Sequence, residues 1–220
     1  MSTNFNPWVI AGILAVIIII LKLIPNSLHA KIIGKKGEDL IEHELDRAYA
    51  RGNAGVVLRN VYVPAGNGRT TEIDLLYITV KGMFVLESKN YSGWVFGNED
   101  DQYWTVTLKS KQKNRIYNPI KQNAGHIKHL REYLRRPIPM FSVVVFSERC
   151  ELKNITLTSH QAIVAKRNRL TETINDIWKS YPDVLTEAEV EEIYYSLYAL
   201  TNASFATKKK HVDEINRRYK

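Results

Sequence analysis

The sequence is poor in cysteine, with Cys150 as the single one among 220 residues. This scarcity excludes an intrachain disulfide and a zinc cluster built from cysteines. Such cysteine usage is typical of proteins that work in a reducing compartment. Cys150 follows an apolar, strand-like run, and no nearby residue is an evident activating base. We therefore expect a partly buried thiol and not a nucleophile.

Acidic residues are nearly absent from residues 109–136, where Glu132 is the single acid. Nine basic residues give this stretch a net charge of +8, which equals the net charge of the whole chain. Localised positive charge is typical of proteins that bind a polyanion, either nucleic acid or an anionic lipid surface. A merely solvated face is the simpler alternative. We predict nucleic-acid contacts from seven of these residues: Lys109, Lys111, Lys113, Arg115, Lys121, Lys128 and Arg131.

Charged residues are also missing from the first 21 positions. Trp8 to Ile24 form an apolar run with Lys22 as its only charge, close to the minimum length of a membrane-spanning helix. A secretory signal peptide fits less well, because no basic residue precedes the run and no small-residue cleavage site follows it. Lysines follow the run but none precedes it, so the positive-inside rule predicts an outer N-terminus and a cytoplasmic C-terminal domain. We expect residues 1–30 to be a single transmembrane anchor and its linker.

Beyond the anchor, the hydrophobic periodicity predicts an α/β domain. Two strands, over residues 72–79 and 83–89, are expected to form a hairpin at Val80-Lys81-Gly82. Asn118 and Pro119 are typical of the cap and first turn of a helix, which is expected to end near Arg136. The other expected elements are helices over 34–50, 170–179 and 186–200, and strands over 56–63, 140–146, 155–157 and 162–165.

Glu38 lies in the first predicted helix, on the same stripe as Ile41 and Leu45. An acid that faces inward needs a partner. An acid in the first turn of a helix complements the helix dipole. The periodicity alone leaves both interpretations open.

The predicted hairpin brings two acids and a lysine to one face. Glu87 and Lys89 are two residues apart, and therefore point to the same side of their strand. A two-residue loop at Val80-Lys81 places Asp74 opposite Glu87, and a loop at Lys81-Gly82 places it opposite Lys89. In either register the three side chains share one face of an otherwise apolar sheet.

These three side chains have the chemistry of a metal-assisted hydrolase. We predict a Mg²⁺ or Mn²⁺ site formed by Asp74, Glu87 and the backbone carbonyl of Ser88, because Mg²⁺ prefers oxygen ligands. Such a cation activates water and neutralises charge that develops on a phosphate. Lys89 is expected to position or deprotonate the attacking water, or to stabilise charge in the transition state. A buried ion pair is the structural alternative, but one lysine cannot neutralise two acids.

The helix that starts at Pro119 carries further polar candidates. Gln122 is a candidate for contact with the metal-bound water or with a phosphate, although an ordinary boundary glutamine is the alternative. His126 and His129 lie on the same stripe. A lone histidine near an apolar face is more often structural, so we predict that neither of them is catalytic.

Four segments carry a resemblance to a known family: Gly34-Lys-Lys-Gly-Glu38, Thr71-Glu-Ile-Asp-Leu-Leu76, Gly82-Met-Phe-Val-Leu-Glu-Ser-Lys-Asn-Tyr-Ser-Gly93 and Tyr117-Asn-Pro-Ile-Lys-Gln122. In this order they resemble the nuclease-related domain, NERD, which is similar to the PD-(D/E)xK restriction-endonuclease-like superfamily. The likeness covers residues 31–154. Residues 155–220 are left as a strand and helical extension with a basic tail.

The resemblance implies a restriction-endonuclease-like fold, with a mixed central β-sheet flanked by helices and a core in the order α-β-β-β-α-β. It also implies the catalytic residues by position: Glu38, Asp74 and Glu87 as acids, Lys89 as the motif lysine, and Gln122 as the polar residue on the helix. Ile73 stands where the superfamily motif has proline, a position that varies freely.

Together these features predict a membrane-anchored, metal-dependent nuclease that hydrolyses DNA phosphodiester bonds at the cytoplasmic side. A non-catalytic nucleic-acid-binding or accessory module with the same fold is one alternative. A protein whose basic stretch binds anionic membrane is another. The acids favour the nuclease, because carboxylates oppose the binding of a polyanion unless a metal ion is present.

Overall fold

The structure, a computed structural model, describes residues 26–201, with side chains from Gly34 onward. Of the two compact units into which the chain divides, the one that starts at Gly37 contains both β-sheets and the candidate site. The predicted membrane span over Trp8 to Ile24 lies outside the described residues. Within residues 26–201, no helix is long and apolar enough to cross a membrane.

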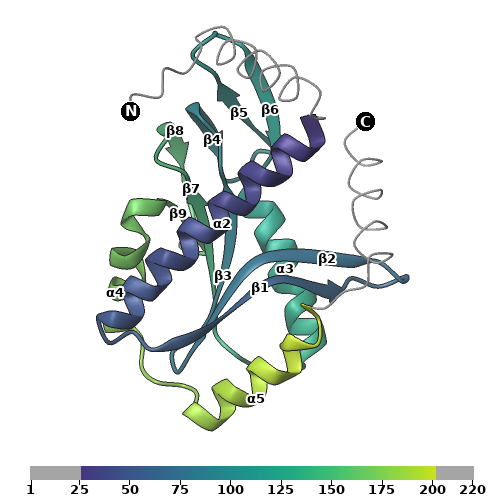
Figure 1. The fold of residues 1–220 in the computed structure, drawn as a ribbon, viewed down its shortest axis with the longest axis vertical. Helices are drawn as coiled ribbons and strands as arrows, with labels where there is room; N and C mark the ends of the chain where they lie inside the picture. Colours follow the sequence, from purple (N-terminus) through teal and green to yellow (C-terminus); the bar gives the residue numbers. More distant parts are fainter. Residues whose placement is uncertain (1–25, 202–220) are drawn as a thin grey trace, which may run out of the picture. The chain divides into compact units, whose positions relative to one another are not determined.

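A five-stranded mixed sheet forms the centre of this unit, with strand order β1-β2-β3-β7-β9 (Figure 1). β1, β2 and β3 are antiparallel neighbours, whereas β3, β7 and β9 run parallel. Its strands are β1 (Gly55–Pro64), β2 (Thr70–Thr79), β3 (Gly82–Lys89), β7 (Met140–Phe146) and β9 (Ala162–Lys166).

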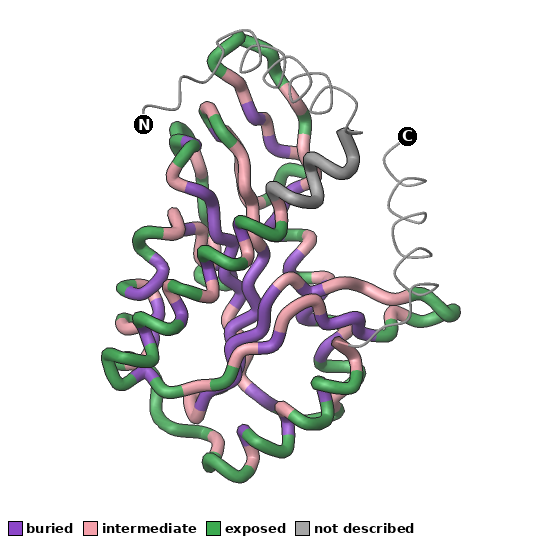
Figure 2. The backbone as a smooth tube through the Cα atoms, viewed as in Figure 1, coloured by how far each residue is buried: buried purple, intermediate pink, exposed green. Residues whose placement is uncertain are grey.

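Helices cover both faces of the central sheet, and the alternation of side chains along each strand explains why. On one face, Leu75 and Leu86 pack with Ile41 of α2 (Asn26–Ala50) and Ile174 of α4 (Leu170–Ser180), which follows the short 3-10 helix η1 (Arg167–Arg169). The opposite face packs against α3 (Pro119–Leu134) and α5 (Glu187–Tyr198). Both faces of the middle strands are therefore buried, as Figure 2 shows.

A second sheet has four strands in the order β6-β5-β4-β8: β4 (Gly93–Asn98), β5 (Tyr103–Thr107), β6 (Lys113–Tyr117) and β8 (Cys150–Thr156). Its buried face shares a core with the end of β7, where the Trp104 indole stacks on Phe146 at 6.1 Å between ring centroids. Gly97 permits this close packing, since a Cβ there would lie 2.3 Å from the Trp104 side chain.

The structure confirms the mixed α/β class and corrects the expectation of one central sheet. Of the second sheet only a strand over 155–157 was predicted, and the polar, basic β6 has no strand-like apolar pattern. β8 is likewise longer than the 155–157 strand that was predicted, because its first residues pair in parallel with β4 from Cys150 onward. Pairing partners distant in sequence therefore define these strands.

Candidate active site

The β2–β3 hairpin sets the register of the candidate active site. Thr79 pairs with Gly82 and Leu75 pairs with Leu86, so the loop is the two-residue Val80-Lys81. Continued by one step, this register places Asp74 opposite Glu87, as the first of the two predicted registers required. The Ser88 N–H donates to Asp74 Oδ2 at 2.7 Å, which ties the two strand ends together.

Glu87 is the most deeply buried acid of the site, with 2% of its surface exposed. Its Oε1 lies 2.7 Å from Lys89 Nζ, and its Oε2 lies 3.1 Å from His126 Nε2. Burial opposes ionisation of Glu87, but the Lys89 charge and the His126 hydrogen bond outweigh it and lower its pKa to about 2. Glu87 is therefore a carboxylate at neutral pH, with both oxygens in use.

Lys89 is held between two partners, because Nζ also donates to Gln122 Oε1 at 3.0 Å. Burial disfavours its charged form, yet the charges of Glu87 and Asp74 raise the pKa of Lys89 above its usual value. In this arrangement the amine stays protonated. A protonated amine suits the stabilisation of negative charge, which is one of the roles predicted for Lys89.

Asp74 has the opposite electrostatic environment. Burial and the nearby Glu87 carboxylate raise its pKa well above the usual value, while Lys89 and the Ser88 N–H only partly compensate. The two carboxyl groups therefore share the charge of one lysine, which contacts Glu87, so the deficit of positive charge falls on Asp74. A divalent cation would supply that charge.

His126, which was predicted from the sequence to be structural and not catalytic, lies in the site. It lies one turn after Gln122 on α3 and is 6% exposed. Its Nε2 contacts Glu87 Oε2, and its Nδ1 lies 2.7 Å from Thr71 Oγ1, so the ring bridges Glu87 and Thr71. The Gln122–His126 spacing of four residues was the available signal. His129 is turned to the surface instead, where it contacts Glu132.

Glu38 reaches the site from α2 and is paired with Arg59 on β1. The same guanidinium contacts Glu38 at 3.4 Å, Asp39 at 2.7 Å and Glu42 at 2.8 Å. Burial raises the pKa of Glu38, and Arg59 partly offsets this shift. The helix begins at Asn26, so Glu38 is not a first-turn acid, and its inward position is compensated by a partner.

Glu38 makes no direct contact with Asp74, Glu87 or Lys89 among the described interactions. Its charge nevertheless contributes to the raised pKa of Asp74. Glu72 adds a further acid on this side, where its Oε1 accepts a hydrogen bond from Tyr62 at 2.7 Å. Glu38 therefore influences the charge of Asp74 without contacting the other members of the site.

The predicted metal ligands can be tested against this geometry. Asp74 and Glu87 offer the hard oxygens that Mg²⁺ prefers, and the charge deficit at Asp74 fits a cation. Each oxygen of Glu87 accepts one contact, from Lys89 or from His126, and keeps a second lone pair that could bind a cation. Among the described residues, no three His, Cys, Asp or Glu side chains are grouped to hold a metal ion.

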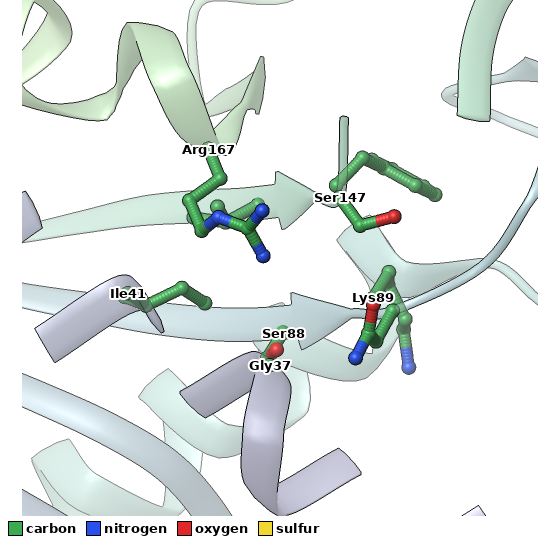
Figure 3. A pocket seen from close by; sticks show the side chains of 9 residues that line it. Gly37, Ile41, Ser88, Lys89, Ser147 and Arg167 are labelled. Carbon is green, nitrogen blue, oxygen red and sulfur yellow. The ribbon is translucent and has the colours of Figure 1, made fainter. Parts of the chain in front are cut away.

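A small hollow lies beside Lys89, where β3 and β7 end (Figure 3). Gly37 and Ile41 of α2 form one wall, Ser147 lies at another, and the Arg167 guanidinium points into it from η1. The approach of α2 to β3 is tight at Gly37, because a Cβ there would lie 3.1 Å from the Asn90 side chain and 3.2 Å from Ser88 Oγ. A second cationic side chain thus borders the carboxyl end of β3.

The seven predicted nucleic-acid contacts are all exposed, but they come from separate elements. Lys109 and Lys111 lie in the β5–β6 loop, and Lys113 and Arg115 on β6. The other three project from α3: Lys121, Lys128 and Arg131. The basic stretch is therefore divided between the second sheet and the helix that carries Gln122 and His126.

A mixed α/β domain with paired carboxylates and a lysine at the end of its central hairpin has the outline of a nuclease-related fold. Comparison with known proteins agrees: the chain belongs to the nuclease-related domain (NERD) family, whose sequence profile matches residues 33–147. It is also 34% identical over 209 residues to an uncharacterized protein of Bacillus anthracis, covering 92% of this chain and 95% of that protein. No solved structure matches the chain.

Proposed function

We propose that this protein is a membrane-anchored, metal-dependent nuclease that hydrolyses DNA phosphodiester bonds. The observation that carries the proposal is the convergence of Asp74, Glu87 and Lys89 at the end of β3, with Gln122 and His126 from α3 holding the last two. Membership of the nuclease-related domain family supports it.

The carboxylates of Asp74 and Glu87, with the backbone carbonyl of Ser88, are the proposed ligands of Mg²⁺ or Mn²⁺. When bound, the cation would polarise the phosphate and lower the pKa of a coordinated water. The cation would stabilise the ionised form of Asp74 most, because it would offset the burial and the repulsion from Glu87 that raise the pKa of Asp74. Glu38 is proposed as the outer acid, held in place by Arg59.

Lys89 is proposed to face the charge that develops on the phosphate. Its raised pKa keeps it cationic, and Gln122 Oε1 fixes the ammonium group at 3.0 Å. A fixed positive charge in a site with little water stabilises a transition state more than a mobile one does. The seven exposed basic residues of β6, its preceding loop and α3 are proposed to hold the polynucleotide.

One specific observation favours a second candidate, a DNA-binding module without catalysis. Both oxygens of Glu87 are already bound, so the cluster is electrostatically satisfied at Glu87 without a metal ion. If that arrangement persisted with DNA bound, the acids would serve stability alone.

The test of catalysis uses the full chain with linear and circular DNA, single- and double-stranded, in Mg²⁺, in Mn²⁺ and in chelator. We expect metal-dependent cleavage, reduced at least about 100-fold by Glu87→Gln and by Lys89→Ala. Glu191→Gln is the matched control, because Glu191 lies exposed on α5, and it should cut like the wild type. Absence of cleavage in a folded protein that still binds DNA would support the non-catalytic module.

The membrane location is proposed from the apolar run of residues 8–24 and the lysines that follow it. In cells, the full chain should sediment with membranes and resist extraction at alkaline pH. Externally added protease should spare the domain in intact cells and digest it after the membrane is opened. Recovery of the full chain in the soluble fraction would refute the anchor.

A further inference from the structure

The second sheet has an open face whose side chains differ from those of an ordinary solvated surface. Along β5 the buried residues Trp104 and Val106 alternate with partly exposed ones, and β6, which has no buried residue, pairs with β5 in register. Val95, Trp104 and Val106 fill the shared core. The opposite set therefore points away from it, and its aromatic and basic members on β4, β5 and β6 are Trp94, Phe96, Tyr103, Tyr117, Lys113 and Arg115.

The aromatic rings on this face are exposed at Trp94 and partly buried at Phe96, Tyr103 and Tyr117, and cations lie beside them. Trp94 is 50% exposed, and Lys153 lies over its ring at 5.4 Å. The Arg115 guanidinium lies over the Tyr103 ring at 4.5 Å, and Tyr103 meets Tyr117 edge to face at 6.1 Å. Exposing an indole to water is costly in apolar surface, so a partner that covers it would be favoured.

The charges on the face suit a polyanion. Lys113, Arg115 and Lys153 are all exposed, and Glu151, which pairs with Lys153 at 2.6 Å, is the single acid that projects with them among the described strands. Lys109 and Lys111 extend the positive charge into the β5–β6 loop. The acids of the β4–β5 turn, residues 99–101, lie at the opposite end of β5 from this basic loop.

Flat aromatic rings interleaved with Lys and Arg on a sheet match one ligand chemistry well. Unpaired bases stack on such rings whatever their sequence, while their phosphates meet the cations. A duplex offers no free base faces, since its bases already stack on each other. An anionic lipid surface would use the cations but has no planar group to stack.

The face is also connected closely to the candidate active site. Only Asn90, Tyr91 and Ser92 separate Lys89 at the end of β3 from β4, and only Asn118 separates β6 from α3. Trp94 is five residues from Lys89, so their Cα atoms are at most about 18 Å apart. A nucleic-acid strand that leaves this face near Trp94 would therefore be close enough to reach Asp74 and Glu87.

We infer that the open face of the β6-β5-β4-β8 sheet binds single-stranded nucleic acid, with Trp94 and Tyr103 stacking on bases and Lys113 and Arg115 contacting phosphates. This inference rests on the proposed function only in its choice of nucleic acid as the partner. It defines the form of substrate delivered to Asp74, Glu87 and Lys89.

The experiment measures fluorescence anisotropy of a labelled 20-nucleotide oligothymidine and of a 20-base-pair duplex with the full chain, in chelator to prevent cleavage. Removing one stacking ring, by Trp94→Ala or Tyr103→Ala, should weaken oligothymidine binding about tenfold, and the double variant about 100-fold. Duplex affinity should change less than about twofold, because phosphate contacts remain. Trp94→Phe and Tyr103→Phe keep a ring and should bind like the wild type.

Tyr195→Ala is the matched control, since Tyr195 is 63% exposed on α5 and outside the face, and it should leave binding unchanged. Thermal unfolding of each variant tests folding, and rescue by the phenylalanine variants separates stacking from loss of structure. Equal loss of single-strand and duplex binding would overturn the inference, as would no loss at all. Preferential loss of binding to phosphatidylserine vesicles would also overturn it.

The two proposals fail separately. If oligothymidine binding depends on Trp94 and Tyr103 while no metal-dependent cleavage exists, the binding face stands and the nuclease does not. If cleavage depends on Glu87 while the aromatic variants bind oligothymidine normally, the nuclease stands and the binding face does not.

Discussion

At the scale of single residues, the site is defined by how Glu87 is held. A carboxylate that is 2% exposed could not stay ionised alone, and Lys89 and His126 each neutralise part of the cost of burying it. The same contacts fix the direction of its two oxygens. His126 is in turn fixed through Nδ1 by the Thr71 hydroxyl. Thr71, His126 and Glu87 thus form a chain from β2 through α3 to β3.

We predict that His126→Ala lowers DNA cleavage about 10- to 100-fold, as the loss of an outer partner of a metal ligand usually does. His126 is a positioning residue, so kcat should fall while KM changes little. His126→Gln keeps an N–H within reach of Glu87 and should recover part of the activity. Initial rates over a range of DNA concentrations measure both constants.

His129→Ala is the control, because His129 lies on the same helix and contacts only Glu132 among the described interactions. It should cut at the wild-type rate. Equal losses in the two histidine variants would mean that α3 is merely perturbed and that His126 has no special role.

At the scale of elements, Asn118 both caps α3 and attaches this helix to the second sheet. Asn118 Oδ1 accepts from the Ile120 N–H at 2.9 Å, as an N-cap does. Its Nδ2 also donates to the carbonyl oxygens of Asn98, Glu99 and Asp101. One fully buried side chain therefore joins the helix that carries Gln122 and His126 to the β4–β5 turn of the second sheet.

We predict that Asn118→Asp destabilises the protein by more than about 2 kcal/mol, although aspartate is normally as good a cap as asparagine. The aspartate keeps the acceptor for Ile120 but loses the donor, and it buries a negative charge against three carbonyl oxygens. Urea unfolding followed by circular dichroism measures the loss.

Thr186→Ser provides the comparison at an exposed cap. Thr186 begins α5 with a capping box to Glu189, and serine preserves that geometry, so the stability should change by less than about 0.5 kcal/mol. A small effect of Asn118→Asp, similar to this one, would show that the contacts to the β4–β5 turn contribute little.

At the scale of the whole unit, the two sheets share one core. β7 belongs to the central sheet, yet Val144 and Phe146 at its end pack among the buried residues of the second sheet. Ile120 from α3 joins the same cluster. Because side chains from both sheets bury each other, we expect them to fold and unfold together.

We predict that Phe146→Ala lowers the free energy of unfolding by about 3–5 kcal/mol, because it removes a fully buried ring and its stacking on Trp104. Urea unfolding should remain a single transition when far-ultraviolet and near-ultraviolet circular dichroism are compared. Two separated transitions in the wild type would show that the sheets are independent domains.

The sequence by itself determined the parts of this protein that depend on local pattern. It predicted the β2–β3 hairpin, the cap of α3, the strands at 140–146 and 162–165, and the family. Asp74, Glu87, Lys89 and Gln122 were also predicted, and the structure brings these four together. Periodicity of two residues in a strand and a fixed cap chemistry are local rules, so they can be read without a fold.

Only the tertiary structure decided how these parts are paired. His126 is 39 residues from Glu87, and Arg59 is 21 residues from Glu38, so no local pattern indicates either contact. The second sheet was likewise hidden, because β6 is polar and β8 pairs with β4 more than 50 residues away. Long-range pairing places buried charges beside their partners, and the same pairing turns a scattered set of aromatic and basic residues into one face.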